Sequence, residues 1–137
     1  MDETTNFEYL DLNTVDPNNS IPPAMYALRI VSAEPKSHEF GPNSKTPGKI
    51  GSKFVLKWVV LDGEFAGRKL NSTIFESSMA PVILRKIMDA TGVKQAENEA
   101  FFSWMARLSD SGADLKVLVE KSDRGNEIKY LSAVPNV

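Results

Sequence analysis

Cysteine is absent from the 137-residue chain, and histidine occurs once, at His38. The lack of cysteine excludes disulfide bonds, zinc sites built on thiolates and cysteine nucleophiles. A single histidine leaves little for a metal site or a catalytic triad. No glycine-rich loop followed by lysine and serine or threonine is present to cradle a phosphate. We therefore expect no enzymatic activity, no metal and no cofactor, and the sequence indicates no catalytic residue.

Long hydrophobic runs and a secretion signal are also missing. The longest apolar run is far shorter than the roughly 20 residues that a membrane-spanning helix needs. The first residues, MDETTNFEYL, are acidic and do not have the pattern of a signal peptide. We expect a cytoplasmic protein without a membrane partner.

The formal net charge of -2 conceals an uneven distribution along the chain. Residues 1–24 contain five acidic residues and no base, whereas residues 25–69 contain eight bases and four acids. An acidic protein can still bind a polyanion if its bases share one face. The alternative is that these lysines and arginines only solvate an ordinary surface.

Alternating apolar residues and helical spacing divide the chain into predicted elements. Residues that interrupt helices and strands, such as Pro22-Pro23, indicate that residues 1–24 form a flexible acidic arm. Pro35 is expected to end the first strand. The predicted strands are 25–35, 53–61, 68–76, 113–122 and 127–134, the predicted helices are 79–91 and 97–109, and a long loop covers 36–52.

Three strands, a helical insert and two further strands form the layout β-β-β-α(α)-β-β. This order predicts a mainly β fold with a helical insert, a five-stranded oligonucleotide-binding (OB) barrel in a single domain over residues 25–137. An open antiparallel sheet packed on two helices is the alternative, because the order of elements does not show which strands pair.

The chain resembles a family of bacteriophage single-stranded DNA-binding proteins, first described as a phage domain of unknown function. The resemblance covers roughly residues 22–134 and lies in a first strand, a glycine-containing hairpin and a helix end. The matching residues are Tyr26-Ala27-Leu28-Arg29-Ile30, Ala33-Glu34-Pro35-Lys36, Leu56, Trp58, Val60, Leu61, Gly63, Gly67, Arg68 and Ala90-Thr91-Gly92.

This resemblance implies an OB fold that binds single-stranded DNA without sequence specificity during phage DNA replication or recombination. Single-stranded DNA is the expected partner, with RNA as an alternative, and replication or recombination proteins and further copies of the chain are candidate partners. The location would then be the infected host cell. Many single-strand binders end in an acidic tail that recruits proteins, whereas this chain ends Val134-Pro135-Asn136-Val137. Recruitment through such a tail is therefore in doubt, although the acidic N-terminal arm could substitute for it.

Single-strand binding requires cations along the phosphate track and flat side chains on which bases stack. Strand alternation puts Arg29, Lys57 and Lys69 on the faces of three strands that point away from the core. The loops add basic residues next to phenylalanines. The predicted DNA-binding residues are Arg29, Lys36, Phe40, Lys45, Lys49, Lys53, Lys57, Phe65, Arg68 and Lys69.

Several of these residues have an alternative interpretation. The loop phenylalanines, such as Phe65, can fold back onto the core instead of meeting a ligand. Trp58 shares a strand face with Leu56 and Val60, which favours a core position over a stacking platform. A β-barrel that binds proteins, for example a phage structural or adaptor subunit, is the alternative function. Such an adaptor would hold its bases in ion pairs or expose an apolar patch.

Overall fold

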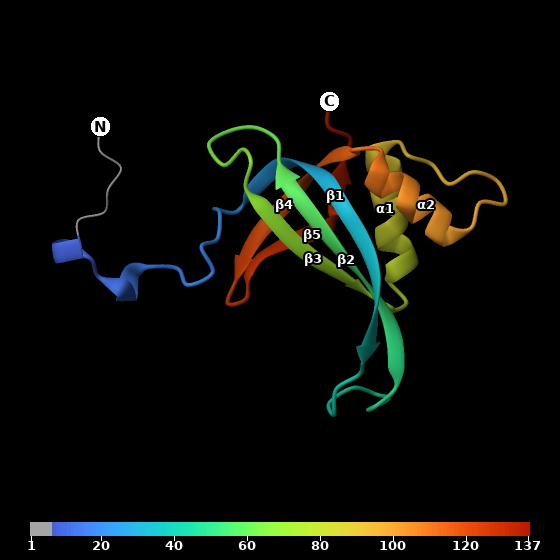
Figure 1. Cartoon of the computed structure of the whole chain (residues 1–137), viewed down its shortest axis with the longest axis horizontal. Helices are drawn as coiled ribbons and strands as arrows, with labels where there is room; N and C mark the ends of the chain where they lie inside the picture. Colours follow the sequence, from blue (N-terminus) through green and yellow to red (C-terminus); the bar gives the residue numbers. More distant parts are fainter. Residues whose placement is uncertain (1–6) are drawn as a thin grey trace.

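The computed structural model describes residues 7–137, which form one antiparallel sheet of five strands and two α-helices (Figure 1). The order of strands across the sheet is β3-β2-β1-β4-β5. The mainly β class and the order of elements along the chain agree with the prediction. The elements are β1 (Ala24–Glu39), β2 (Ile50–Val60), β3 (Lys69–Phe75), α1 (Ala80–Thr91), α2 (Phe101–Asp110), β4 (Asp114–Ser122) and β5 (Gly125–Val134).

The hydrophobic core lies between one face of the sheet and the two helices. Along β2, Leu56, Trp58 and Val60 are buried and Lys57 between them is exposed, as the alternation predicts. The helices supply Ile87 from α1 and Leu108 from α2 to the same core. Both helices are amphipathic, so their apolar stripes cover this face and leave the opposite face of the sheet open.

The two edge strands, β3 and β5, come together through side chains. Ser72 on β3 accepts hydrogen bonds from the indole nitrogen of Trp58, at 2.8 Å, and from the hydroxyl of Tyr130 on β5. Burial raises the pKa of Tyr130 to about 12, which keeps its hydroxyl protonated as a donor. The sheet therefore curls until its edges touch, although within residues 7–137 no ladder of strand pairing joins β3 to β5.

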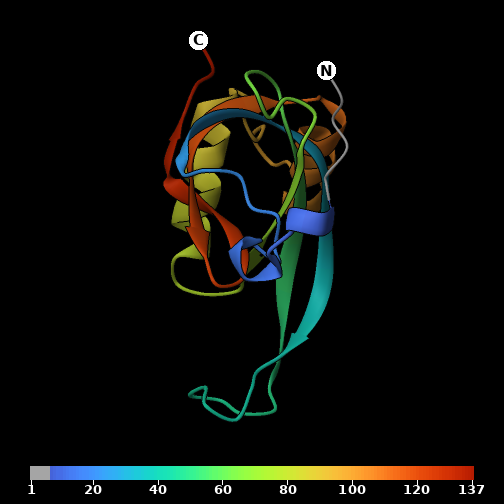
Figure 2. The same cartoon turned by 90° about the vertical axis from the view of Figure 1, so that its left-hand side faces the viewer.

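Strands β1 and β2 form a long hairpin that extends beyond the rest of the sheet (Figure 2). The prediction that Pro35 ends the first strand is wrong, because β1 continues to Glu39 and Pro35 pairs with Phe54. Strand β4 pairs with β1 only as far as Arg29, so the later part of β1 has a free edge. Proline is tolerated at such an edge because no partner there needs its missing N–H. The predicted long loop shrinks to residues 40–49.

The end of the predicted N-terminal arm is attached to the turn between β4 and β5. Ile21 is completely buried, and its backbone N–H and carbonyl each form a 2.9 Å hydrogen bond with the side-chain amide of Asn126. Asn18 donates to the carbonyl of Asp123, and Asp16 lies 3.4 Å from the amine of Lys121. Residues 1–6 of the predicted arm lie outside the described residues.

The carboxylate of Asp16 should make this attachment sensitive to acid. Backbone N–H groups of Asn18 and Ser20 donate to it and lower its pKa from 3.8 to about 2. A carboxylate whose pKa is lower in the folded state stabilises the fold above its unfolded pKa and loses that effect as the pH falls towards its folded pKa. We expect Asp16→Asn to reduce the loss of stability between pH 5 and pH 2, measured by urea unfolding. An equal loss in both proteins would contradict this.

Candidate nucleic-acid interface

The face of β1, β2 and β3 that points away from the helices gathers basic side chains from all three strands, and we call it the outer face. In one cross-strand row, Lys36 lies opposite Lys53. Further along β2, Lys57 lies opposite Asn71 of β3. In the next row of this face, Arg29 of β1 and Lys69 of β3 flank Val59 on either side. The structure thus brings together five of the predicted residues, Arg29, Lys36, Lys53, Lys57 and Lys69.

The central cations of the outer face have no acidic partner among residues 7–137. Lys57 and Lys69 are exposed, and neither forms an ion pair with any residue between 7 and 137. The guanidinium of Arg29 is 3.9 Å from the carboxylate of Asp114, a long and exposed contact that contributes little. Glu34, opposite Val55, adds one negative charge to the same face. The lysines are therefore available to an anionic ligand.

A polar hollow of about 330 Å³ continues the outer face beyond β3. It lies between the start of β3, the β4–β5 turn and the end of the N-terminal segment, and we call it the basic hollow. Arg68, Lys69 and Arg124 line it together with side-chain amides that include Asn71 and Asn126. Since Lys69 and Asn71 also belong to the outer face, the hollow and the face form one continuous surface.

Sequence reasoning missed Arg124. In the sequence, the run Asp123-Arg124-Gly125-Asn126 has the composition of a hairpin turn, and in the structure it lies at the turn between β4 and β5. A base at a turn tip is predictably exposed, but its approach to Arg68 depends on how β5 curls towards β3. No local pattern in the sequence predicts that Arg68 and Arg124 line the same hollow.

The remaining basic candidates, Lys45 and Lys49, are exposed in the loop 40–49 at the tip of the hairpin. This loop leads into the start of β2, whereas Lys69 of the basic hollow pairs with Val59 near the end of β2. The two groups of bases therefore lie at the two ends of the outer face, with Lys53 and Lys57 between them.

The loop phenylalanines pack against the protein. The ring of Phe40 lies over Gly51, where an added Cβ would approach it to 3.1 Å. Phe65 is half-buried against the core and meets the ring of Tyr26 edge-on, with 6.4 Å between centroids. The alternative of folding back onto the core describes Phe65, whereas Phe40 packs against the hairpin at Gly51. Phe75, which was not predicted, is instead an exposed aromatic residue on the outer face, with the amine of Lys53 at 5.9 Å from its ring centroid.

Among residues 7–137, with the His38 side chain left aside, no group of three or more histidine, aspartate or glutamate side chains is arranged to hold a metal ion. Neither described helix has the length and apolar character that crossing a membrane requires.

No protein-family model matches the chain, and no curated protein matches it at a significant level. A function is therefore inferred from the residues and their arrangement.

Proposed function

We propose that the protein binds single-stranded DNA, without sequence specificity, along the outer face and the basic hollow. The observation that supports this most strongly is the position of Lys57 and Lys69. Both stand on an exposed sheet face without an acidic partner among residues 7–137, and Lys69 continues into a hollow lined by two arginines. Such a track of cations matches a phosphate backbone.

The topology supports an OB-type barrel as the scaffold. Strand β1 is central and pairs with both β2 and β4, and the helices are inserted between β3 and β4. OB folds are partly open five-stranded barrels that bind oligonucleotides on the face of their second and third strands and on the loops joining strands 1–2 and 4–5. In such a scaffold, the outer face, the loop 40–49 and the turn with Arg124 would correspond to these binding surfaces.

The aromatic component of binding is expected at Phe75. Base stacking on an aromatic side chain contributes about 1–3 kcal/mol per base and tolerates any sequence. Phe75 is 46% exposed and lies beside the cation of Lys53, so a stacked base there would keep its phosphate within reach of a lysine. Trp58 cannot serve this purpose because it is buried.

The resemblance to phage single-stranded DNA-binding proteins supports a role in phage DNA replication or recombination. The alternative role, a protein-interaction module, predicts either that the bases are held in ion pairs or that the surface has an apolar patch. Ion pairing is judged on three strand cations, Arg29, Lys57 and Lys69. Among residues 7–137, only Arg29 contacts an acid, and its guanidinium is 3.9 Å from the carboxylate of Asp114.

A salt titration tests the proposal directly. The protein should bind a fluorescent oligo-dT more tightly than a duplex of the same length. The logarithm of its affinity should fall with the logarithm of salt concentration, with a slope of about -0.7 for each phosphate neutralised. Fluorescence anisotropy measures both quantities. Equal affinity for duplex, or an affinity independent of salt, would rule the proposal out.

A further inference from the structure

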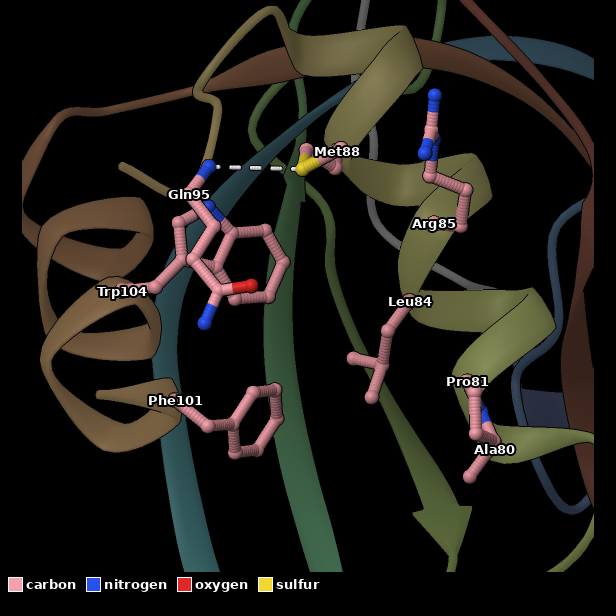
Figure 3. A pocket seen from close by; sticks show the side chains of 8 residues that line it. All are labelled: Ala80, Pro81, Leu84, Arg85, Met88, Gln95, Phe101 and Trp104. Atoms are coloured by element: carbon pink, nitrogen blue, oxygen red, sulfur yellow. Dashed lines mark hydrogen bonds between the residues drawn. The ribbon is translucent and has the colours of Figure 1, made fainter. Parts of the chain in front are cut away.

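A second hollow, of about 450 Å³, lies on the helix side of the molecule between α1 and α2, and we call it the helix groove (Figure 3). Pro81, Leu84 and Met88 of α1 form one wall, and Phe101 and Trp104 of α2 form the other. Its volume is within the range of about 300–1,000 Å³ that is typical of ligand sites. It has room for several apolar side chains.

The aromatic wall of the helix groove is held in place by its own contacts. The indole nitrogen of Trp104 donates a 2.6 Å hydrogen bond to the carbonyl of Val93. The ring of Phe101 lies 5.9 Å from Trp104 and 5.3 Å from Phe54, centroid to centroid. These contacts keep the rings from collapsing into the groove, so its apolar wall stays open to a partner.

A segment of the same chain has the complementary character. Residues 8–15 include two acids and no base, and we call them the docking segment. Three of their apolar side chains are strongly exposed: Tyr9 by 79%, Leu12 by 73% and Val15 by 51%. The helix groove is apolar, and its lining includes one charged residue, Arg85. The contact of Arg85 with Asp89 is exposed and weak, so its guanidinium can also meet a carboxylate of the segment.

The docking segment does not reach the helix groove of its own chain. The chain is attached at Asp16 to the β4–β5 turn, and Figure 1 shows the segment and the helices at opposite ends of the molecule. From Asp16 to Tyr9, an extended chain spans at most about 25 Å. A domain of this length is about 35 Å across.

We propose that the docking segment of one copy binds the helix groove of a second copy. The contact joins two different surfaces, so it is head-to-tail: the copy that supplies the segment still has an open groove, and the copy that supplies the groove still has its own segment. Such a contact produces rings or open chains according to the rotation between copies. It leaves the outer face uncovered and does not depend on what that face binds.

Two variants at one position test the groove. Pro81 is exposed in the first turn of α1 and lines the groove. Pro81→Glu puts a negative charge against the acidic segment, and we expect it to weaken self-association about tenfold or more in sedimentation velocity. Glutamate suits the first turn of a helix, so the fold should persist, as its melting temperature will show. Pro81→Lys is the matched control and should not weaken association.

A third variant, Tyr9→Ser combined with Leu12→Ser, removes apolar contacts from a segment outside the core and should weaken association about a hundredfold. Mixing this variant with Pro81→Glu leaves one intact segment and one intact groove. At a concentration at which each variant alone is monomeric, the mixture should therefore form a 1:1 dimer. A wild-type chain that stays monomeric at every concentration would overturn the proposal. So would a segment variant that associates like wild type, or a mixture that stays monomeric.

Discussion

Replacing Trp58 by alanine is expected to remove about 3–5 kcal/mol of folding stability. The side chain is 1% exposed, lies between Leu56 and Val60 on the buried face of β2, and donates a 2.8 Å hydrogen bond to Ser72. Truncation leaves a large cavity and removes one of the two donors at Ser72, where the edge strands meet. Because folded domains are stable by only about 5–15 kcal/mol, part of the variant protein should be unfolded.

Lys57→Ala is the matched control for Trp58→Ala, because the two residues are neighbours on opposite faces of one strand. Lys57 is exposed, so its removal should change the unfolding free energy by no more than about 0.5 kcal/mol. Urea unfolding and oligo-dT binding, measured on both variants, separate the two faces. A Trp58→Ala protein that keeps its stability but no longer binds DNA would mean that the faces are assigned the wrong way round.

Reversing two charges on the outer face is expected to lower the affinity for oligo-dT on the order of a hundredfold at low salt. Lys57→Glu with Lys69→Glu removes two phosphate contacts and adds repulsion at the junction with the basic hollow. The slope of log affinity against log salt should become shallower by about 1.4, which is about 0.7 for each lost contact. Stability should hardly change, since both side chains are exposed.

The control for this double variant must change the net charge equally on another surface. Lys86→Glu with Lys94→Glu does so, because Lys86 lies on α1 and Lys94 follows it, and both are exposed. Net charge alone affects both proteins in the same way at long range. If the two double variants lost affinity equally, the effect would come from total charge, and the outer face would not be the binding surface.

Local patterns in the sequence were sufficient to predict the elements and the faces of the central strands. Successive side chains of a strand point to opposite sides, so the run from Lys53 to Leu61 determines that Trp58 faces inward if Lys57 faces outward. Helical spacing likewise puts Trp104, Met105 and Leu108 on one face of α2, and all three are buried. Gly92, in the left-handed region with a φ of 74°, ends α1 as predicted.

Features that depend on a neighbouring strand were not predicted correctly. Pro35 indicates a strand end in any sequence, yet β1 continues past it because β4 has already stopped pairing and leaves a free edge. Ile21 precedes the predicted domain boundary at residue 25, yet it is part of the core, because Asn126 binds its backbone. Both outcomes depend on residues far away in the chain.

The sequence by itself determined which strand side chains face the solvent, and therefore which lysines are available to a ligand, because alternation is a property of the local backbone. The tertiary structure alone decided which of those bases lie on the same surface. The approach of Arg124 to Arg68 and Lys69, and the packing of Phe65 against Tyr26, depend on strand register and on the curl of the whole sheet. Register and curl follow from the packing of every strand and helix together, so no single stretch of sequence contains them.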